Sequence, residues 1–282
     1  MNTRAWGLVA FTLLMQTSVG VLLVVVAIQP FVSRGPTHAS ARPFDLPLLV
    51  ASAAAVAGLL ASLSHLGHPL QAWLALTNVR TSWLSREVVL AVLFAVTGAT
   101  FTALLRSGSA PGLVREFLCV LAVVLGIACV FAMSRLYMVP AQPAWNRVAT
   151  PVTFFATTLL LGSAVVIATL AARPVDVASP LVVIAVALLV VQVLLIPAHL
   201  AALVREPAAA ISAGSVGHTA AWLAAGRALA AVAAIVFLVG MLRGMAGAIS
   251  PAAAIATLVL VFVSELLGRL LFYASSVNLG PV

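Results

Sequence analysis

The amino-acid sequence predicts an all-α integral membrane protein, a bundle of eight transmembrane helices, and two observations carry that prediction. The first is composition: 64% of the 282 residues are hydrophobic and only 7% are charged, whereas a water-soluble domain is about 45–50% apolar. So large an apolar excess cannot be hidden inside one soluble globule, which keeps a polar shell. The second is length, because eight apolar runs are each close to the roughly 20 residues that a helix needs to cross a bilayer.

Helix-breaking residues separate the eight runs, as expected of transmembrane helices joined by short loops. Pro30 closes the first run, Gly67 and Pro69 follow the second, and Pro151 suits the first turn of the fifth. The runs lie at about 5–31, 46–66, 84–105, 113–134, 150–171, 180–203, 219–242 and 251–273. The intervals between them are too short for a soluble domain, so we expect residues 1–282 to form a single transmembrane domain. An even helix count places both termini on the same side of the membrane.

The charge balance is basic, with 14 Lys and Arg residues against six acidic ones and a net charge of +8. All of the basic residues are arginines that occur singly between apolar runs, which favours lipid headgroups over nucleic acid as their partners. Seven of them fall on the N-terminal side and six on the other, so the positive-inside rule assigns no orientation. The two cysteines form no C-x-x-C pair, and we expect no iron–sulfur, zinc or other metal site in this chain.

The most polar stretch of the chain, Ser62–Glu87, connects the second and third runs. It holds His65, His68, Arg80, Arg86 and Glu87. Polar groups at the edge of the hydrocarbon are costly and usually functional, so we interpret this stretch as one wall of a quinol site at the membrane surface. A neutral imidazole at His65 can accept a proton from a quinol hydroxyl. The alternative role for His65 is to bond a free carbonyl at the helix end.

Glu87 stands at the beginning of the third run. We expect Ser85 to cap this helix and Glu87 to lie in its first turn, where the helix dipole alone favours a carboxylate. The functional alternative is that Glu87 accepts a proton or a hydrogen bond from quinol. Because the second helix ends on the side where the third begins, His65 and Glu87 can share one pocket.

The connection between the fourth and fifth runs lies on the same side and is rich in aromatic and basic side chains, including Arg135, Tyr137 and Trp145. Such residues commonly form a belt at the membrane surface. They can equally wall a headgroup pocket or contact a soluble partner. From this geometry we expect Arg86, Arg135 and Tyr137 to line the quinol pocket.

Three ionisable residues fall within the seventh and eighth runs of the C-terminal half. Arg227 falls within the seventh run, where a charge needs an internal partner. Glu265 is a candidate partner, and it is also spaced i, i+4 from Arg269. We expect these three residues to form structural ion pairs. A haem b between His65 and His199 is geometrically possible, but no recognisable haem pattern accompanies the pair.

Together these motifs resemble the membrane-anchor subunit of the dimethyl sulfoxide reductase (molybdopterin oxidoreductase) family over the whole chain. The residues that carry the resemblance are His65-Leu66-Gly67-His68-Pro69, Ser85-Arg86-Glu87, Arg135-x-Tyr137 with the later Trp145, Thr150-Pro151, Arg227, and the run from Glu265 through Gly268-Arg269 to Phe272-Tyr273. No single motif is specific, and their order and spacing together indicate the family.

The resemblance implies a non-catalytic anchor with no haem or iron–sulfur cluster of its own. It implies a heterotrimer with a molybdopterin catalytic subunit and an iron–sulfur subunit in the bacterial cytoplasmic (inner) membrane. The family's quinol site involves a histidine and a glutamate that match His65 and Glu87. Menaquinol would be oxidised there, and its electrons would pass to the nearest cluster for reduction of an acceptor such as dimethyl sulfoxide. The site and both termini would face the partners, outside the cell membrane.

The sequence leaves other functions open. A related anchor can run in reverse, reducing quinone while its complex oxidises a substrate such as sulfite. A transporter would need polar groups spread through the bilayer midplane, whereas only Arg227, Glu265 and Gln192 lie deep. A haem-b anchor would show a Soret band in the purified subunit.

Overall fold

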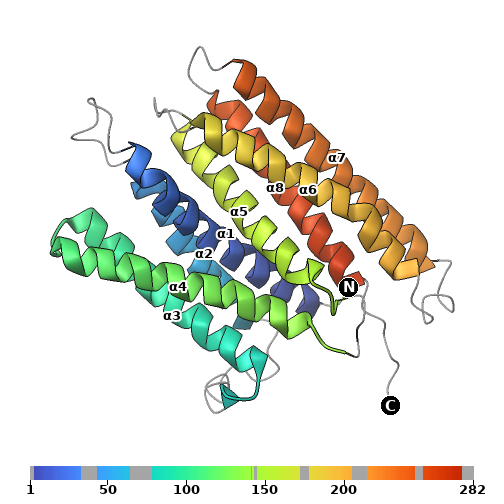
Figure 1. Ribbon diagram of the computed structural model, residues 1–282, viewed down its shortest axis with the longest axis horizontal. Coiled ribbons are helices and arrows are strands. Elements are labelled where there is room, and N and C mark those ends of the chain that lie inside the picture. Colours follow the sequence, from blue (N-terminus) through green and yellow to red (C-terminus); the bar gives the residue numbers. More distant parts are fainter. Residues whose placement is uncertain are drawn as a thin grey trace.

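The protein is all-helical in the parts that its structure describes. The computed structural model describes residues 3–32, 43–63, 78–140, 142, 145–171, 178–204, 215–244 and 250–274. Eight α-helices occupy these ranges: α1 (Thr3–Val32), α2 (Asp45–Leu63), α3 (Trp83–Ser107), α4 (Gly112–Tyr137), α5 (Ala149–Leu170), α6 (Ala178–Val204), α7 (Ser215–Arg243) and α8 (Pro251–Ala274) (Figure 1). Each is long and apolar enough to cross a membrane. The prediction of an eight-helix membrane bundle is therefore confirmed.

Two helices extend three or four residues beyond the predicted runs. Helix α4 continues to Tyr137 instead of ending near residue 134, and α7 is already helical at Ser215 instead of starting near residue 219. Both differences have one cause. Hydropathy marks the part of a helix that lies in hydrocarbon, while the backbone hydrogen bonds continue through polar residues at the membrane surface. The extension of α4 is important for the site, because it makes Arg135 and Tyr137 helical.

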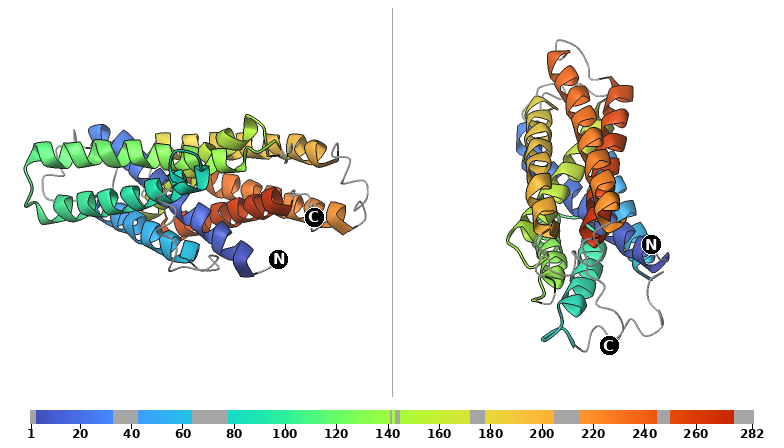
Figure 2. Two further views of the ribbon diagram at one scale, coloured as in Figure 1. Left: turned by 90° about the horizontal axis from the view of Figure 1, so that it is seen from below. Right: turned by 90° about the vertical axis from the view of Figure 1, so that its right-hand side faces the viewer.

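Helices α1 and α5 form the centre of the bundle. Of the apolar window in each helix, 72% is buried in α1 and 67% in α5, against 28% in α2, α3 and α7. Helices α1 to α4 pack on one another, as do α5 to α8, and the main contact between these two halves is α1 against α5. Helices α3 and α4 flank the centre on one side and α6 and α7 on the other (Figure 1). Seen from below, the bundle is a slab, longer than it is thick (Figure 2).

The two halves meet backbone to backbone at two glycines. A methyl group built on Gly20 of α1 would lie 1.9 Å from the carbonyl oxygen of Thr158 in α5. One built on Gly162 of α5 would lie 2.2 Å from the carbonyl carbon of Gly20. Lipid tails are as apolar as the helix surfaces, so close packing of small residues is a main source of helix association in a bilayer. The absence of a side chain at both positions thus sets the distance between the halves.

Helix α1 begins and α8 ends at the same end of the bundle (Figure 1). We call this the site end; there α1, α3, α5 and α7 begin and α2, α4, α6 and α8 end. A hydrogen bond from the Trp145 indole to the carbonyl of Phe272 joins the connection between α4 and α5 to the end of α8. Of the residues proposed for function, Arg86 and Glu87 at the start of α3 and Arg135 and Tyr137 at the end of α4 lie at the site end.

Candidate functional site

The start of α3 fixes where Glu87 points. The cap is Ser82, not Ser85 as predicted: Ser82 is extended, and its hydroxyl oxygen accepts a hydrogen bond from the Ser85 amide. Serine is a common N-cap residue, and an N-cap side chain bonds the amide two or three residues on, so either serine could cap this helix; the cap that forms lies three residues earlier than expected. Glu87 therefore lies beyond the first turn, and only 1% of it is exposed. The favourable interaction with the helix dipole is small compared with the cost of burying a carboxylate so completely, so the dipole alone does not explain the position of Glu87.

The carboxylate of Glu87 has an unused acceptor. Its Oε1 atom is buried and has no hydrogen-bond partner among the described residues. Its charge interacts through the protein interior with Arg269 of α8 and with the Tyr137 and Cys129 side chains of α4. A buried carboxylate oxygen without a partner is unusual in a native structure, and such groups occur where a ligand or ion supplies the missing bond.

An aromatic cluster lies next to Glu87 at the site end. Its members are Tyr137, Trp145, Phe154, Phe272 and Tyr273, contributed by α4, α5, α8 and the connection between α4 and α5. The hydroxyl oxygens of Tyr137 and Tyr273 lie 2.6 Å apart. The Trp145 and Phe272 rings are stacked with their centroids 5.1 Å apart, and Tyr137 meets the Phe272 ring edge-on at 5.3 Å. These contacts give the region beside Glu87 rigid, flat apolar surfaces.

Two of the predicted pocket residues gather on the ring of Trp83. The guanidinium carbon of Arg86 lies 4.3 Å from the centre of this ring, and that of Arg135 lies 5.5 Å away. Arg86 also donates to the carbonyls of Val79 and Arg80, so its charge covers the turn that precedes α3. Both arginines are half-buried, and together with Trp83 they form a cationic rim over the start of α3.

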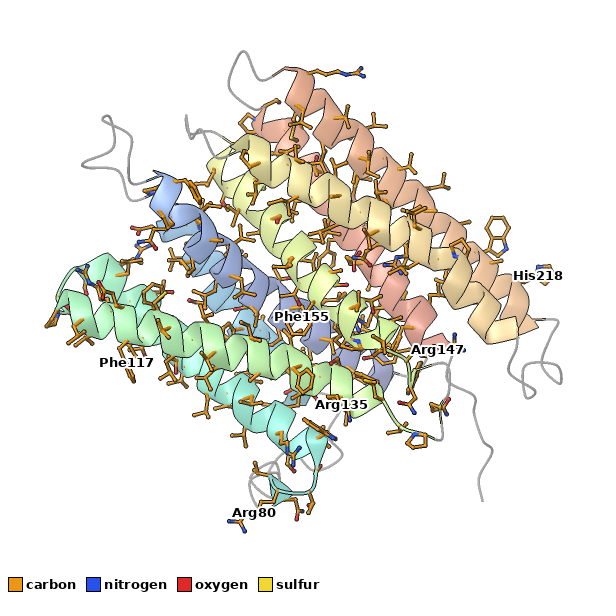
Figure 3. All side chains as sticks on the ribbon, in the orientation of Figure 1. Arg80, Phe117, Arg135, Arg147, Phe155 and His218 are labelled. Carbon is orange, nitrogen blue, oxygen red and sulfur yellow. The ribbon has the colours of Figure 1, made fainter. Side chains whose placement is uncertain are left out.

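Basic side chains also mark the site end as a whole. Arg80, Arg135 and Arg147 follow this end of the bundle from α3 to α8, and His218 lies at its far edge, on α7 (Figure 3). Phe117, near the start of α4, lies toward the opposite end (Figure 3). Arg80 and Arg147 are exposed, so both side chains lie at the surface of this end.

Arg269 is held by two contacts in the interior, one to Gln16 and one to the ring of Phe154. Only 6% of it is exposed. Its Nη2 atom donates to Oε1 of Gln16 at 2.6 Å, and its guanidinium carbon lies 4.0 Å from the centre of the Phe154 ring. The amide nitrogen of Gln16 donates to the Phe154 carbonyl at 2.8 Å, which fixes Gln16 in turn. Sequence analysis considered Glu265 as the partner of Arg269; the structure gives Arg269 a hydrogen bond to Gln16.

A second polar group lies deeper, among α5, α6, α7 and α8. Glu265 accepts hydrogen bonds from Gln192 at 2.8 Å and from Thr157 at 2.5 Å. Arg227 donates to the Gln192 side-chain oxygen, and its Nη2 atom lies 3.7 Å from Glu265 Oε1. These four side chains and Arg269 border a cavity of about 50 Å³. The network gives each polar group a partner in a region where an unpartnered one is costly.

The structure describes some of the predicted site residues and not others. Glu87 and Tyr137 are both buried and interact electrostatically, while Arg86 and Arg135 lie over the Trp83 ring at the start of α3. His65 and His68 fall in residues 64–77, outside the described ranges. The side chain of His199 also lies outside them, so the structure does not address the haem pairing. Within the described residues no group of three or more His, Cys, Asp and Glu side chains is arranged to hold a metal ion.

Sequence reasoning did not identify several of the residues that hold the site together. These are Gln16, Trp83, Thr157 and the partner role of Tyr273. Gln16 and Thr157 stand beside other polar residues, Thr17 and Thr158, within long apolar runs. That is itself a signal, because a polar side chain at this depth needs a partner on another helix. The sequence does not say which helix supplies that partner.

The protein is similar to members of one family. The family model described as "DMSO reductase anchor subunit (DmsC)" matches residues 1–275. The YnfH subunit of an anaerobic dimethyl sulfoxide reductase of Escherichia coli (strain K12) is 31% identical over 160 residues, which is 56% of this chain and 54% of that protein. The C subunit of the anaerobic dimethyl sulfoxide reductase of Haemophilus influenzae (strain ATCC 51907 / DSM 11121 / KW20 / Rd) is 27% identical over 165 residues, 57% of this chain and 58% of that protein.

A third relative matches a shorter part of the sequence. The C subunit of the anaerobic dimethyl sulfoxide reductase of Escherichia coli (strain K12) is 34% identical over 107 residues, 37% of each protein. The matched segments thus span little more than half the length of the first two relatives. No solved structure matches the protein.

Proposed function

The chain belongs to the DMSO reductase anchor subunit (DmsC) family, and from that premise we propose that it oxidises menaquinol at the site end of its bundle. It is a multi-pass membrane protein and an anchor subunit of a DMSO reductase-type complex. We propose further that residues 1–282 act as one transmembrane domain in the bacterial cytoplasmic membrane. Its partners in the proposal are an iron–sulfur subunit, which takes the electrons, and a molybdopterin subunit, which reduces the terminal acceptor.

The buried, unpartnered oxygen of Glu87 is the observation that carries this proposal. A quinol hydroxyl is a hydrogen-bond donor that reaches the protein from the lipid phase, and it can supply the bond that this oxygen lacks. The aromatic cluster at the site end offers flat faces to a quinol ring, and its two tyrosines, Tyr137 and Tyr273, both interact electrostatically with Glu87. The residues present therefore fit a quinol headgroup.

In the proposed reaction the protein groups take up protons. Oxidation of a quinol releases two electrons and two protons. Glu87 accepts one proton at its free oxygen, and His65, on the segment that leads into α3, accepts the other. Both residues pass these protons to water at the site end, and the electrons leave for the iron–sulfur partner. The rim arginines Arg86 and Arg135 close the pocket at the level of the headgroups and favour an electron-rich oxygen below them.

The test uses the whole complex, with Glu87→Gln and His65→Ala made separately. We expect each variant to assemble with its partners but to lose reduction of the partner's clusters by a reduced naphthoquinone, followed by the electron paramagnetic resonance signal of the clusters. Reduction of the same clusters by dithionite should be unchanged, because it bypasses the quinol site. Cluster reduction at the wild-type rate in either variant would remove that residue from the mechanism.

The protein supplies a matched control for each variant. Glu116→Gln removes an exposed carboxylate from the start of α4, at the opposite end of the bundle. His218→Ala removes an exposed imidazole at the site end, on α7 (Figure 3). Both control variants should oxidise quinol at the wild-type rate. The same assay run with oxidised quinone and a substrate such as sulfite tests the reverse direction.

A further inference from the structure

A polar cavity of about 50 Å³ lies inside the C-terminal half of the bundle, bordered by α5, α6, α7 and α8. These four helices pack on one another (Figure 1). The charged and hydrogen-bonding side chains that line the cavity are Thr153, Thr157, Gln192, Arg227, Glu265 and Arg269. Polar groups inside the hydrocarbon are costly unless they are hydrogen-bonded, so whatever fills this cavity contributes to the stability of the fold.

The guanidinium of Arg269 has donors that the described residues do not use. Its Nη2 atom donates to the side-chain oxygen of Gln16, and this is the only hydrogen bond that joins Arg269 to the described part of the chain. Its guanidinium carbon lies 4.0 Å from the centre of the Phe154 ring and 5.9 Å from that of Phe272, and these ring faces replace no N–H···O bond. Only 6% of Arg269 is exposed. Most N–H groups of a buried cation are thus left without an acceptor from these residues.

Glu265 offers acceptors to the same cavity. Its two oxygens accept hydrogen bonds from Gln192 at 2.8 Å and from Thr157 at 2.5 Å. The Nη2 atom of Arg227 lies 3.7 Å from Oε1, which is longer than a hydrogen bond. An ionised carboxylate has about four lone-pair positions, so Glu265 can accept further bonds from a small molecule. Unused donors and unused acceptors therefore border one space.

The size and the mixed polarity of the cavity select water as its occupant. Pockets for organic ligands are about 300–1,000 Å³, so a cavity of about 50 Å³ is too small for a quinol ring. A water molecule needs about 10–15 Å³ of such space, which leaves room for about three. An anion can only accept hydrogen bonds and would be repelled by Glu265. Water can donate to this carboxylate and accept from the guanidinium of Arg269.

We propose that this cavity is an internal hydration site, in which a small cluster of ordered water molecules bridges Arg269 and Glu265. The water supplies the acceptors that the guanidinium lacks and the donors that the carboxylate can still take. Because Arg269 is bonded to Gln16, the cluster extends the network of Glu265 and Gln192 to α1. The two halves of the bundle are then joined by a polar bridge as well as by the glycine crossing of α1 and α5. This inference does not depend on the role proposed for Glu87.

Electron cryomicroscopy of the intact complex, at a resolution that shows ordered water, tests the site directly. We expect separate density peaks within hydrogen-bond distance of Arg269 and of Glu265, and the same peaks in chloride and in bromide buffer. A cavity without density would refute the hydration site. A single peak that becomes stronger when bromide replaces chloride would overturn water as the ligand and assign an anion.

Radiolytic hydroxyl-radical labelling gives a second readout, because the radicals form from bound water and react with the side chains beside it. Phe272 lines the cavity and should be labelled. Thr153→Leu places a larger apolar side chain on the cavity wall, displaces water and should remove most of the Phe272 label. Thr153→Val keeps the size of the side chain and should retain the label. An unchanged Phe272 label in Thr153→Leu would overturn the inference.

The protein supplies matched controls for the labelling. Thr100 and Thr153 both donate to a carbonyl of their own helix, but Thr100 is exposed on α3, away from the cavity. Thr100→Leu should therefore leave the Phe272 label unchanged. Met133 reports on a dry interior, because it is fully buried and its thioether oxidises readily where water reaches it; its label should stay low in every variant. If Thr153→Leu fails to assemble, the density in the wild-type cavity decides.

Discussion

The guanidinium of Arg227 lies directly against the backbone of α8 at Gly268. A methyl group built on Gly268 would come within 2.7 Å of the Arg227 guanidinium carbon and within 2.9 Å of its Nη1 atom. The absence of a side chain there lets the α7 arginine cross α8 and reach the Gln192 and Glu265 side chains beyond it. Gly268, one turn from the buried Glu265 carboxylate, thus leaves the room through which polar groups reach and stabilise that charge.

Substitution of this glycine should disturb the deep network. In Gly268→Ala the new methyl group forces the Arg227 guanidinium away from its partners, so we expect a loss of about 1–3 kcal/mol of stability. Thermal unfolding of the purified complex in detergent measures it. Gly240→Ala in α7 is the control, because a methyl group there meets nothing within 4 Å. Equal unfolding temperatures for the two variants would show that the network tolerates the displaced arginine.

Removing one charge of the Arg227–Glu265 ion pair should lower the stability of the protein more than removing both charges. In Arg227→Leu the Glu265 carboxylate stays buried with one cation fewer, and breaking a buried pair in this way costs about 3–5 kcal/mol. In the double variant Arg227→Leu, Glu265→Leu no unpaired charge is left, and the loss should be smaller. Unfolding of the three proteins under one set of conditions checks this order. A double variant less stable than Arg227→Leu would contradict it.

The sequence was sufficient to predict the membrane bundle because hydrocarbon imposes a strict rule. Every backbone group in the bilayer must be satisfied within its own helix, so long apolar runs between breakers can be read as spanning helices. The cap of α3 was predicted wrongly because Ser82 and Ser85 carry equivalent side chains three residues apart. Only the backbone conformation at Ser82 distinguishes the cap from its neighbour. A shift of one helical turn then changes the depth at which Glu87 lies.

The sequence was enough to predict at which end of the bundle the candidate site lies, but not which side chains contact one another there. Connectivity alone places Glu87, Arg135 and Tyr137 at one end, because helix ends alternate between the two membrane surfaces. Spacing along a helix also made Glu265 a natural partner for Arg269. The structure gives Arg269 a bond to Gln16 of α1, 253 positions away in the sequence. Partners on different helices depend on how the helices are rotated, which no single run of residues specifies.

The crossing of α1 and α5 should be the least tolerant position of the fold. In Gly20→Ala the methyl group would overlap the Thr158 carbonyl, and backbone atoms cannot move aside as a flexible side chain can. The two halves must separate, so we expect a loss at or above the upper end of about 1–3 kcal/mol and a lower yield of folded protein. Size-exclusion chromatography and thermal unfolding in detergent measure both effects.

A third glycine provides the control for that crossing. A methyl group at Gly58 of α2 would make contacts of 3.4 Å or longer with α1, which is ordinary van der Waals packing. Gly58→Ala should therefore be nearly neutral, while Gly162→Ala should behave like Gly20→Ala. If all three variants unfold alike, the close approach of α1 and α5 does not determine the stability of the bundle.

The hydroxyl pair of Tyr137 and Tyr273 should be energetically coupled. Tyr137 is buried and Tyr273 is half-buried, and their hydroxyl oxygens lie 2.6 Å apart. Tyr273→Phe therefore leaves the Tyr137 hydroxyl short of a bond and costs about 1–3 kcal/mol. Once one hydroxyl is gone, removing the second costs less. A double-mutant cycle of the two Tyr→Phe changes, measured by unfolding in detergent, should give a coupling energy of about 0.5–3 kcal/mol. Additive effects would mean that the hydroxyls act independently.

Two substitutions of Tyr137 distinguish the role of its aromatic ring in the proposed site from the role of its hydroxyl group. Tyr137→Phe keeps the edge-on contact with Phe272 and the flat face beside Glu87, so quinol should still reduce the partner's clusters. Tyr137→Ala removes the ring, opens a cavity and should cost about 3–5 kcal/mol of stability together with quinol-dependent reduction. Cluster reduction by dithionite checks that the complex remains assembled. A Tyr137→Phe variant as inactive as Tyr137→Ala would assign the hydroxyl, and not the aromatic face, to quinol binding.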